Sequence, residues 1–230
     1  MFTSPKSLFI AVLAALVLTA CGGGDSAGAQ GQGGPLLVDE SNFDNTALGV
    51  ALAALPAETL SEAEKASLAF MREEEKLAHD VYALSATLWG GSTKIFGNIA
   101  ISESTHMEAM RQLLERYTLI DPAATTAPGI FQNATLQALY TQLATAGAPT
   151  LVDALKVGAT IEEVDMIDIN AALLNVVSQD IRLVYDNLLK GSRNHLRSFV
   201  NTLQAQGVTY VPQYMALADY TAIVSTPIER

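Results

Sequence analysis

A glutamate and a histidine three residues apart interrupt an otherwise apolar stripe between residues 96 and 117. The stripe advances by threes and fours, a spacing that places its members on one face of an α-helix. Its members are Phe96, Ile99, Glu103, His106, Met110, Leu113 and Tyr117. Burying Glu103 and His106 on such a face is costly unless a partner satisfies them. A metal ion is the simplest partner, so we expect other helices to supply further ligands.

Length and composition favour one helical domain. A chain of 230 residues can bury a sizeable core. Half of the residues are hydrophobic but only 7% are aromatic, which suits packed helices better than a β-sandwich. The formal net charge of −11 argues against nucleic-acid binding and against electrostatic adhesion to anionic lipid.

Residues 1–20 have the anatomy of a signal peptide. Lys6 precedes an apolar run from Leu8 to Leu18 that is short for a transmembrane span. The run ends in Leu18-Thr19-Ala20-Cys21, which resembles the lipobox of bacterial lipoproteins. The resemblance implies lipidation of Cys21 and a lipid-anchored protein of the cell envelope, at the periplasmic face or the cell surface. The alternative is an ordinary secretory signal that leaves Cys21 as a free thiol.

The remaining chain divides into a tether and a helical domain. Residues 21–40 are rich in Gly, Gln, Ser and Ala, which predicts a flexible tether. Residues 41–230 are predicted to form the domain, with its core at 60–207. Four long helices are expected at about 61–89, 93–118, from 151 onward, and 179–206. The first begins at a Ser61-x-x-Glu64 capping box and stops at Gly90, and the last stops at Gly207.

Shorter elements are predicted between and before these helices. Residues 43–55 are expected to form a helical turn or two, and the connection at 119–149 contains an amphipathic stretch after Asn133. The third long helix is expected to break near Asp165, because Asp168 could cap a short helix that reaches Val176. The predicted fold class is all-α: a ferritin-like four-helix bundle with a long connection between helices 2 and 3.

Every one of the four helical stripes becomes polar near its middle. The polar residues are Glu75, then Glu103 and His106, then Glu162 and Asp165, and finally Ser192 and His195. Di-iron bundles use a Glu from two helices and Glu-x-x-His from the other two. Carboxylates and imidazoles suit Fe, Mn and Zn, and the lack of thiols argues against iron–sulfur chemistry.

At these residues the chain resembles the ferritin-like superfamily, in particular the sites of rubrerythrin and bacterioferritin. Glu75-x-x-Ala78-x-x-x-Tyr82 is similar to the helix 1 signature, Glu103-x-x-His106 to the helix 2 motif, and Glu162-x-x-Asp165 to the helix 3 carboxylates of rubrerythrins. Residues 60–215 also resemble an uncharacterised ferritin-like family of bacteria and archaea. The segments that carry this second resemblance are Met71-Arg-Glu-Glu-Glu-Lys, Ser104-Thr-His-Met and Gly191-Ser-Arg-Asn-His-Leu-Arg.

The fourth helix departs from the pattern, because Ser192 stands where the resemblance requires a glutamate. Either Asp165 replaces the missing carboxylate, or the second metal position is weak and the site holds one ion. The first alternative gives a di-iron site, with Mn or Zn possible, whose ligands are Glu75, Glu103, His106, Glu162, Asp165 and His195. Glu74 is the fallback for Glu75, Asp165 could instead be a helix cap, and His195 could be a buried residue hydrogen-bonded to the backbone or to a carboxylate. A lone Glu-x-x-His such as Glu103 and His106 also occurs on solvated helix faces.

The sequence also suggests roles for polar residues near the stripes. Tyr82 and Tyr185 face the stripes and could donate to a ligand carboxylate. His79 is expected to face solvent. Arg193 and Arg197 either neutralise the carboxylates or lie on the surface as ordinary charges.

The resemblance implies a fold and not an established activity. If the site is a di-metal carboxylate centre, the expected chemistry is Fe(II) oxidation, or reduction of dioxygen or peroxide, at the cell envelope, with no catalytic residue beyond the metal ligands. The alternative is a non-catalytic envelope lipoprotein whose bundle holds a structural or single metal and serves interaction or metal sequestration. A third alternative is an inert bundle with a hydrogen-bonded polar layer. The sequence leaves open which metal and oxidant are used, and whether the chain forms a homodimer.

Overall fold

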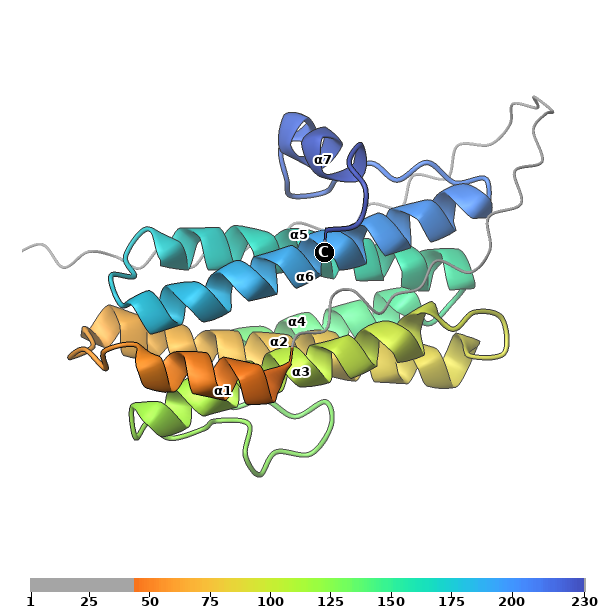
Figure 1. Ribbon diagram of the computed structural model, residues 1–230. Helices are drawn as coiled ribbons and strands as arrows, with labels where there is room; N and C mark the ends of the chain where they lie inside the picture. The colour runs from red at the N-terminus through yellow and green to blue at the C-terminus, as the bar shows by residue number, and fades with distance from the viewer. Residues whose placement is uncertain (1–43, 230) are drawn as a thin grey trace, which may run out of the picture. The chain divides into compact units, whose positions relative to one another are not determined.

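The computed structural model describes residues 44–229, and all secondary structure in this part is helical (Figure 1). Its seven helices and the lack of any strand among these residues confirm the all-α prediction. Among the same residues, no helix combines the length and apolar character needed to cross a membrane. The predicted signal peptide at 1–20, the Cys21 lipidation site and the tether at 21–40 lie outside the described residues.

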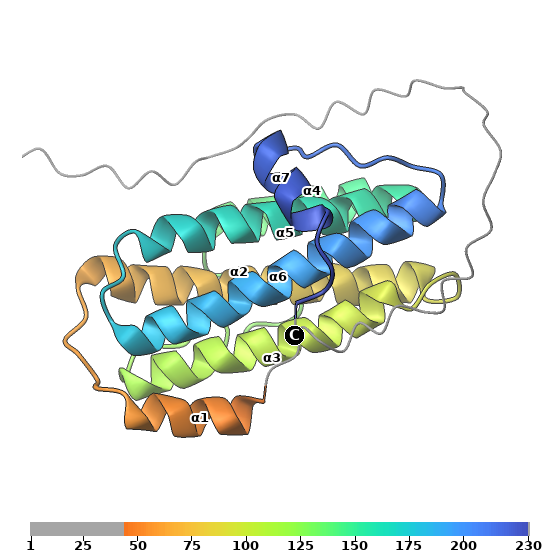
Figure 2. The same ribbon diagram turned by 45° about the horizontal axis from the view of Figure 1, so that its top comes forward.

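Four long helices enclose the core. They are α2 (Glu62–Trp89), α3 (Ile95–Arg116), α5 (Leu151–Leu173) and α6 (Gln179–Ala205), and they lie side by side in both ribbon views (Figures 1 and 2). α2 packs against α3 and α5, and α6 packs against the same two helices. Large side chains that are fully buried fill the space between them, including Tyr82, Phe96, Met110, Tyr185 and Phe199.

The predicted start of α2 is confirmed by its cap. The Ser61 side chain accepts from the Glu64 amide, and the Glu64 carboxylate accepts from the Ser61 amide at 2.9 Å. The other carboxylate oxygen of Glu64 accepts from Ser178 Oγ at 3.1 Å, just before α6 begins. One capping residue therefore fixes both the start of α2 and its position beside α6.

The predicted long connection between α3 and α5 is confirmed, and it contains α4 (Ala134–Gly147). Asn133 caps α4 by accepting from the amides of Thr135 and Leu136. α4 packs against α2 and α5. Glu73 of α2 holds the connection in place, since its carboxylate accepts from the backbone amides of Gln132 and Asn133.

The predicted break in the third long helix is wrong, because α5 runs without interruption from Leu151 to Leu173. Asp165 contacts the Ser192 hydroxyl of α6. Asp168 shares a hydrogen bond with the Glu74 side chain of α2. Both acids therefore point toward neighbouring helices, and neither one caps a helix.

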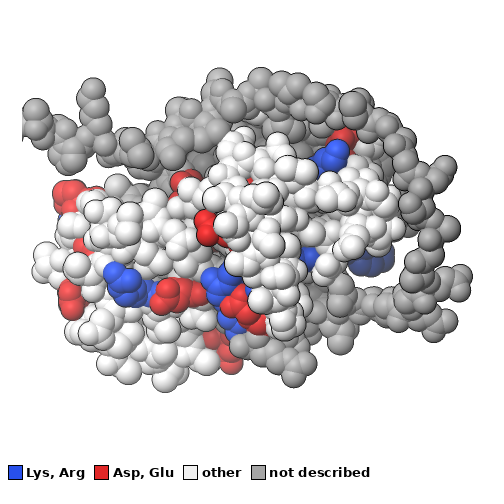
Figure 3. All heavy atoms as spheres, turned by 90° about the horizontal axis from the view of Figure 1, so that it is seen from above, with Lys and Arg blue, Asp and Glu red and all other residues white. Residues whose placement is uncertain are grey.

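Two short helices complete the fold. α1 (Asn45–Ala54) packs against α3, and α7 (Leu217–Val224) packs against α6. Gly207 adopts a positive φ of 75° after Gln206, the C-cap of α6, as expected of a glycine that ends a helix. On the face that carries α7, acidic and basic side chains are interspersed among uncharged ones (Figure 3).

Candidate metal centre

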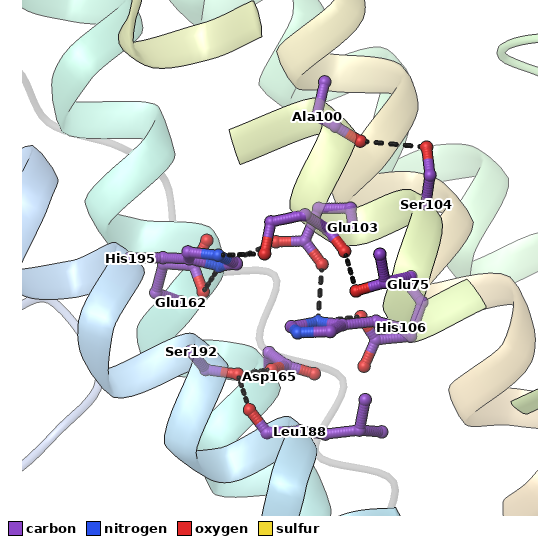
Figure 4. Close-up of polar contacts among 12 residues, drawn as sticks. Glu75, Ala100, Glu103, Ser104, His106, Glu162, Asp165, Leu188, Ser192 and His195 are labelled. Atoms are coloured by element: carbon purple, nitrogen blue, oxygen red, sulfur yellow. Dashed lines mark hydrogen bonds and ion pairs between the residues drawn. The ribbon is translucent and has the colours of Figure 1, made fainter. Parts of the chain in front are cut away.

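All six predicted ligands meet in the space between the four long helices (Figure 4). Glu75 comes from α2, Glu103 and His106 from α3, Glu162 and Asp165 from α5, and His195 from α6. Each is at least nine-tenths buried. Their convergence follows from the stripes, because each residue occupies the core-facing side of its helix near mid-length.

The first group of ligand atoms comes from Glu75, Glu103 and His106. These residues offer one atom each within 4.8 Å of one another. His106 Nδ1 lies 2.9 Å from Glu103 Oε2 and 3.2 Å from Glu75 Oε2. A single ring nitrogen thus faces two carboxylates, which is a geometry that one cation can occupy.

The second group comes from Glu103, Glu162 and His195, again with one atom each within 4.8 Å. His195 Nδ1 lies 2.8 Å from Glu103 Oε1 and 3.5 Å from Glu162 Oε2. Glu103 therefore belongs to both groups and directs one oxygen toward each histidine (Figure 4). The two imidazole rings are stacked, with centroids 5.4 Å apart.

Two hydroxyl groups orient the second group. Ser102 Oγ lies 2.9 Å from His195 Nε2, so it fixes the ring with Nδ1 toward the carboxylates. Tyr82 donates to Glu162 Oε1 at 2.5 Å, which is the kind of contact that the sequence suggested for both tyrosines. Tyr185 instead pairs with Ser67 at 2.7 Å and touches no predicted ligand through its hydroxyl. The sequence did not identify Ser102 as a site residue, because it lies beside the periodic stripe of α3 and not on it.

Ser192 and Asp165 form a contact of their own beside the two groups. Ser192 Oγ is hydrogen-bonded to Asp165 Oδ2, while the buried Asp165 Oδ1 has no hydrogen-bond partner. Asp165 contributes to neither group of converging atoms. The serine in the place of a fourth-helix carboxylate thus contacts a carboxylate supplied by α5 (Figure 4).

The charges of the centre hold protons in the absence of metal. Burial disfavours a charged His195, yet Glu103 and Glu162 raise its pKa to about 9. The pKa of His106 is likewise raised, by Glu103 and Glu75, despite its burial. The pKa of Glu103 is lowered, since both imidazoles outweigh the effect of burial. Burial raises the pKa of Glu75 to about 7.

The donor set fits a divalent metal. Glu75 Oε1 and Asp165 Oδ1 are buried oxygens without hydrogen-bond partners, although buried oxygens are normally satisfied. Mixed carboxylate and imidazole donors suit Fe, Mn and Zn. Because these ligands must lose their protons to bind, metal would replace the protons that the raised pKa values retain.

Four further residues near the centre contribute no ligand to it. Arg193 pairs with Glu229, and Arg197 donates to the carbonyls of Ile223 and Thr226, so neither neutralises the centre. His79 is half-buried rather than solvent-facing, because its Nδ1 lies 2.9 Å from Asp80 Oδ1. The fallback ligand Glu74 faces Asp168 and belongs to neither group.

Comparisons with known proteins find relatives over most of the chain. Residues 64–227 match the family described as "Uncharacterized protein domain (DUF2202)", a range that includes all six predicted ligands. The chain is 46% identical to "Uncharacterized protein MJ0754" of Methanocaldococcus jannaschii over 179 residues, 78% of this chain and 96% of that protein. It is also similar to the crystal structure of hypothetical protein MJ0754 from Methanococcus jannaschii DSM 2661. That likeness has a TM-score of 0.74 and 46% identity over 76% of this chain and 99% of the other.

Proposed function

The chain belongs to the family described as "Uncharacterized protein domain (DUF2202)", and on this premise we propose that its helical domain is a ferritin-like four-helix bundle that binds two metal ions. The observation that carries the proposal is the position of Glu103. Its two oxygens face two histidines, and each histidine also faces a second carboxylate. One bridging carboxylate between two similar groups suits a pair of ions.

The arrangement of helices supports the ferritin-like assignment. α2 and α3 are joined by a short turn, as are α5 and α6, while 34 residues, 117–150, separate α3 from α5. A bundle with one long crossover in the middle is the ferritin-like connectivity. The inward-facing Glu and Glu-x-x-His residues at mid-length occupy the positions that hold metals in such bundles.

In this proposal each residue has a defined part. Glu103 bridges, Glu75 and His106 bind one ion, and Glu162 and His195 bind the other. Ser102 and Tyr82 hold His195 and Glu162 in place, and Asp165, which belongs to neither group, places a carboxylate beside Ser192. When iron is bound, such a centre supplies Fe(II) oxidation coupled to the reduction of dioxygen or peroxide. Dense packing of the four helices keeps the ligands away from bulk water.

The predicted signal peptide and lipobox support a location of the protein at the cell envelope, where a lipid on Cys21 would anchor it. Such a location favours metal scavenging or peroxide defence over cytoplasmic iron storage. A non-catalytic bundle that holds one structural ion is the second candidate. Ser192 favours it, because a hydroxyl is a weaker ligand than the carboxylate it replaces.

Metal content and Fe(II) oxidation together test the proposal. We expect about two ions per chain in the purified protein after incubation with Fe(II), and none in the Glu103→Ala/His106→Ala variant. Added aerobically, Fe(II) should give faster growth of ferric absorbance with the unaltered protein than with the variant. Two bound ions without accelerated oxidation would support sequestration instead. Equal, near-zero metal in both proteins would overturn the proposal.

A further inference from the structure

The end of the bundle at which α5 joins α6 carries a group of exposed apolar side chains. Ile120 is 88% exposed, Leu174 86% and Val177 71%, the three highest values among the large apolar residues of 44–229. Ile120 follows α3, and the other two lie in the connection between α5 and α6. Both ribbon views place this connection and the end of α3 at the same end of the bundle (Figures 1 and 2). Single exposed apolar residues are ordinary, whereas a group of them marks an interaction site.

Hydrogen bonds hold the two segments next to each other. Asp180, at the start of α6, accepts from the Tyr117 hydroxyl at 2.6 Å and from Arg116 Nε at 2.8 Å. Both donors lie at the end of α3, and Asp180 is fully buried. Ile120 follows Tyr117 by three residues, and Val177 precedes Asp180 by three. The exposed apolar residues therefore flank a single contact between α3 and α6.

The α5–α6 connection has a defined conformation that leaves Leu174 and Val177 outside. Arg182 Nη2 donates to the carbonyl of Val176 at 2.7 Å, and the Val177 amide donates to Glu64 Oε1 at 3.2 Å. The side chain of Val176 is buried, so this short connection already contributes one apolar residue to the core. The exposure of its two neighbours thus belongs to a hydrogen-bonded backbone and not to a loose loop.

The two segments are also free of charge, in a chain that has 24 acidic and 13 basic residues. Residues 117–120 and 169–179 contain no charged side chain. Uncharged apolar groups can enter a lipid interface without the cost of removing water from an ion. Contact of this kind needs no attraction to anionic lipid, which the net charge of −11 would oppose.

The predicted lipid anchor can hold this end close to a membrane. Cys21 lies 23 positions before Asp44, where the described part of the chain begins. A flexible chain of that length spans roughly 26 Å on average. The ten residues of α1 extend about 15 Å and end beside α3, where the Leu55 carbonyl accepts from Arg116 at 2.7 Å. A tether of this reach gives an effective concentration on the order of millimolar, so even a weak apolar contact would be occupied.

We propose that Ile120, Leu174 and Val177 form a membrane-docking end, which inserts into the lipid surface to which Cys21 anchors the chain. The docking end stands on the exposure of these three side chains, and its anchor rests on the lipidation proposed above. Its partner is the interfacial region of a bilayer and not an anionic headgroup. Docking would direct the long helices away from the membrane, with the turn between α2 and α3 at the far end.

Fluorescence of single-cysteine variants in vesicles tests this proposal. The full chain is purified with its lipid, labelled at Val177→Cys with an environment-sensitive fluorophore, and reconstituted in phosphatidylcholine vesicles that contain nitroxide-labelled lipid. Val211→Cys is the matched control, because Val211 is a valine of 63% exposure next to Tyr210, which contacts Glu163 in the middle of α5. The nitroxide should quench the label at position 177 at least about fivefold more than the label at position 211.

A second measurement removes the apolar side chains themselves. With the label on Ile120→Cys, adding Leu174→Ser and Val177→Ser should reduce quenching at least about threefold, because less apolar surface enters the lipid. Both residues are exposed, so circular dichroism should show intact helices. Equal quenching at positions 177 and 211, or no effect of the two serines, would overturn the proposal. Emission at position 177 that follows the number of chains per vesicle, without quenching by the lipid, would indicate a second copy and also overturn it.

The labelling step separates the docking end from the anchor. A lipidated Cys21 takes no label, whereas a free thiol does, and mass spectrometry of the intact chain detects the difference. If Cys21 is free, the same measurements are made with Cys21→Ser at high lipid concentration. Stronger quenching at position 177 than at position 211 would then keep the docking end although the anchor fails. Because neither measurement uses metal, failure of the di-metal function would leave these results unchanged.

Discussion

Glu103 differs from the other carboxylates of the centre because its two oxygens serve two different histidines. Oε2 lies 2.9 Å from His106 Nδ1, and Oε1 lies 2.8 Å from His195 Nδ1. Glu162 faces His195 only, at 3.5 Å. Removing the negative charge of Glu103 should therefore affect metal binding more than removing that of Glu162.

We expect Glu103→Gln to weaken binding of both ions and Glu162→Gln to weaken binding of one. The glutamine amide keeps the volume of the side chain, but its single oxygen is a weak metal ligand. Because Glu103 is shared between the two ions, this change removes a ligand from both of them. Dialysis against increasing Zn²⁺, followed by elemental analysis, measures the loss. Equal loss in the two variants would contradict a bridging role for Glu103.

The stability of the metal-free protein should fall as pH rises from 6 to 9. The folded pKa of His195 is about 9 and that of Glu75 about 7, both above their usual values. A raised folded pKa contributes stability that is present below the unfolded pKa and lost as pH passes the folded pKa. Glu75 acts in this direction up to about pH 7, and His195 acts in this direction up to about pH 9. The lowered pKa of Glu103 adds no slope there, because its contribution is lost only in acid.

Thermal unfolding of metal-free and Zn²⁺-loaded protein at pH 6 and pH 9 measures this effect. The metal-free midpoint should drop by at least about 5 °C, a shift that corresponds to roughly 2 kcal/mol. The loaded protein should change less, because the metal replaces the protons. A metal-free midpoint that rises with pH would show that the carboxylates and histidines do not hold these protons.

At the scale of helices, the close approach of α5 and α6 depends on Gly158. A Cβ at this position would lie 2.4 Å from Cε1 of Phe199. The Phe199 ring packs against Tyr82 and Phe96, with centroids 5.3 and 5.9 Å away. Tyr82 in turn donates to Glu162, so the packing of this layer positions a predicted ligand.

Gly158→Ala should lower the free energy of unfolding by about 1–3 kcal/mol, since the added methyl group forces Phe199 and its neighbours apart. Gly97→Ala is the matched control within α3, because a Cβ there meets no atom within 4 Å. It should raise stability by up to about 1 kcal/mol through helix propensity. Urea unfolding of both variants gives the two values. A neutral Gly158→Ala would mean that the α5–α6 contact has room to relax.

Local signals account for the helices that the sequence predicted well. Ser61 and Glu64 begin α2, and Gly207 follows α6, because caps act within a few residues. The continuity of α5 could not be predicted this way. Asp168 reads as a cap in the sequence, but its partner Glu74 lies on α2, 94 residues away along the chain. Side chains that contact distant helices leave no local pattern.

The same limit applies to the charged run Met71-Arg-Glu-Glu-Glu-Lys of α2, which is buried throughout. The periodic stripe identified Glu75, which faces His106. Its neighbours are buried for other reasons: Arg72 pairs with Asp121, Glu73 accepts from two amides, and Lys76 pairs with Asp80 at 2.5 Å. The long connection supplies several of these partners, so only the folded chain explains why α2 is enclosed on every side.

At the scale of the whole molecule, residues 207–229 form a segment held against α5 and α6 at both ends. The fully buried Glu163 accepts from the Tyr210 hydroxyl at 2.6 Å and from the amides of Tyr214 and Met215. At the far end, Glu229 pairs with Arg193. Tyr210 and Tyr220 of this segment are both buried. Glu163 gave no signal, because its main donors are backbone amides.

Glu163→Gln should release this segment while leaving the helices folded. The neutral amide loses the charge that strengthens three or more hydrogen bonds, and its NH₂ group cannot accept from the facing amides. We expect proteases to cut between residues 207 and 217 at least about tenfold faster, because cleavage follows the population of the open form. Asp219→Asn, at an exposed acid of α7, is the control and should not change the rate of cleavage.

Mass spectrometry of the fragments locates the cuts, and circular dichroism shows whether the long helices persist. An unchanged cleavage rate would show that Glu229 and the packing of Tyr210 and Tyr220, and not Glu163, hold the segment in place. Loss of the helical signal would show that Glu163 is needed for the folding of the long helices.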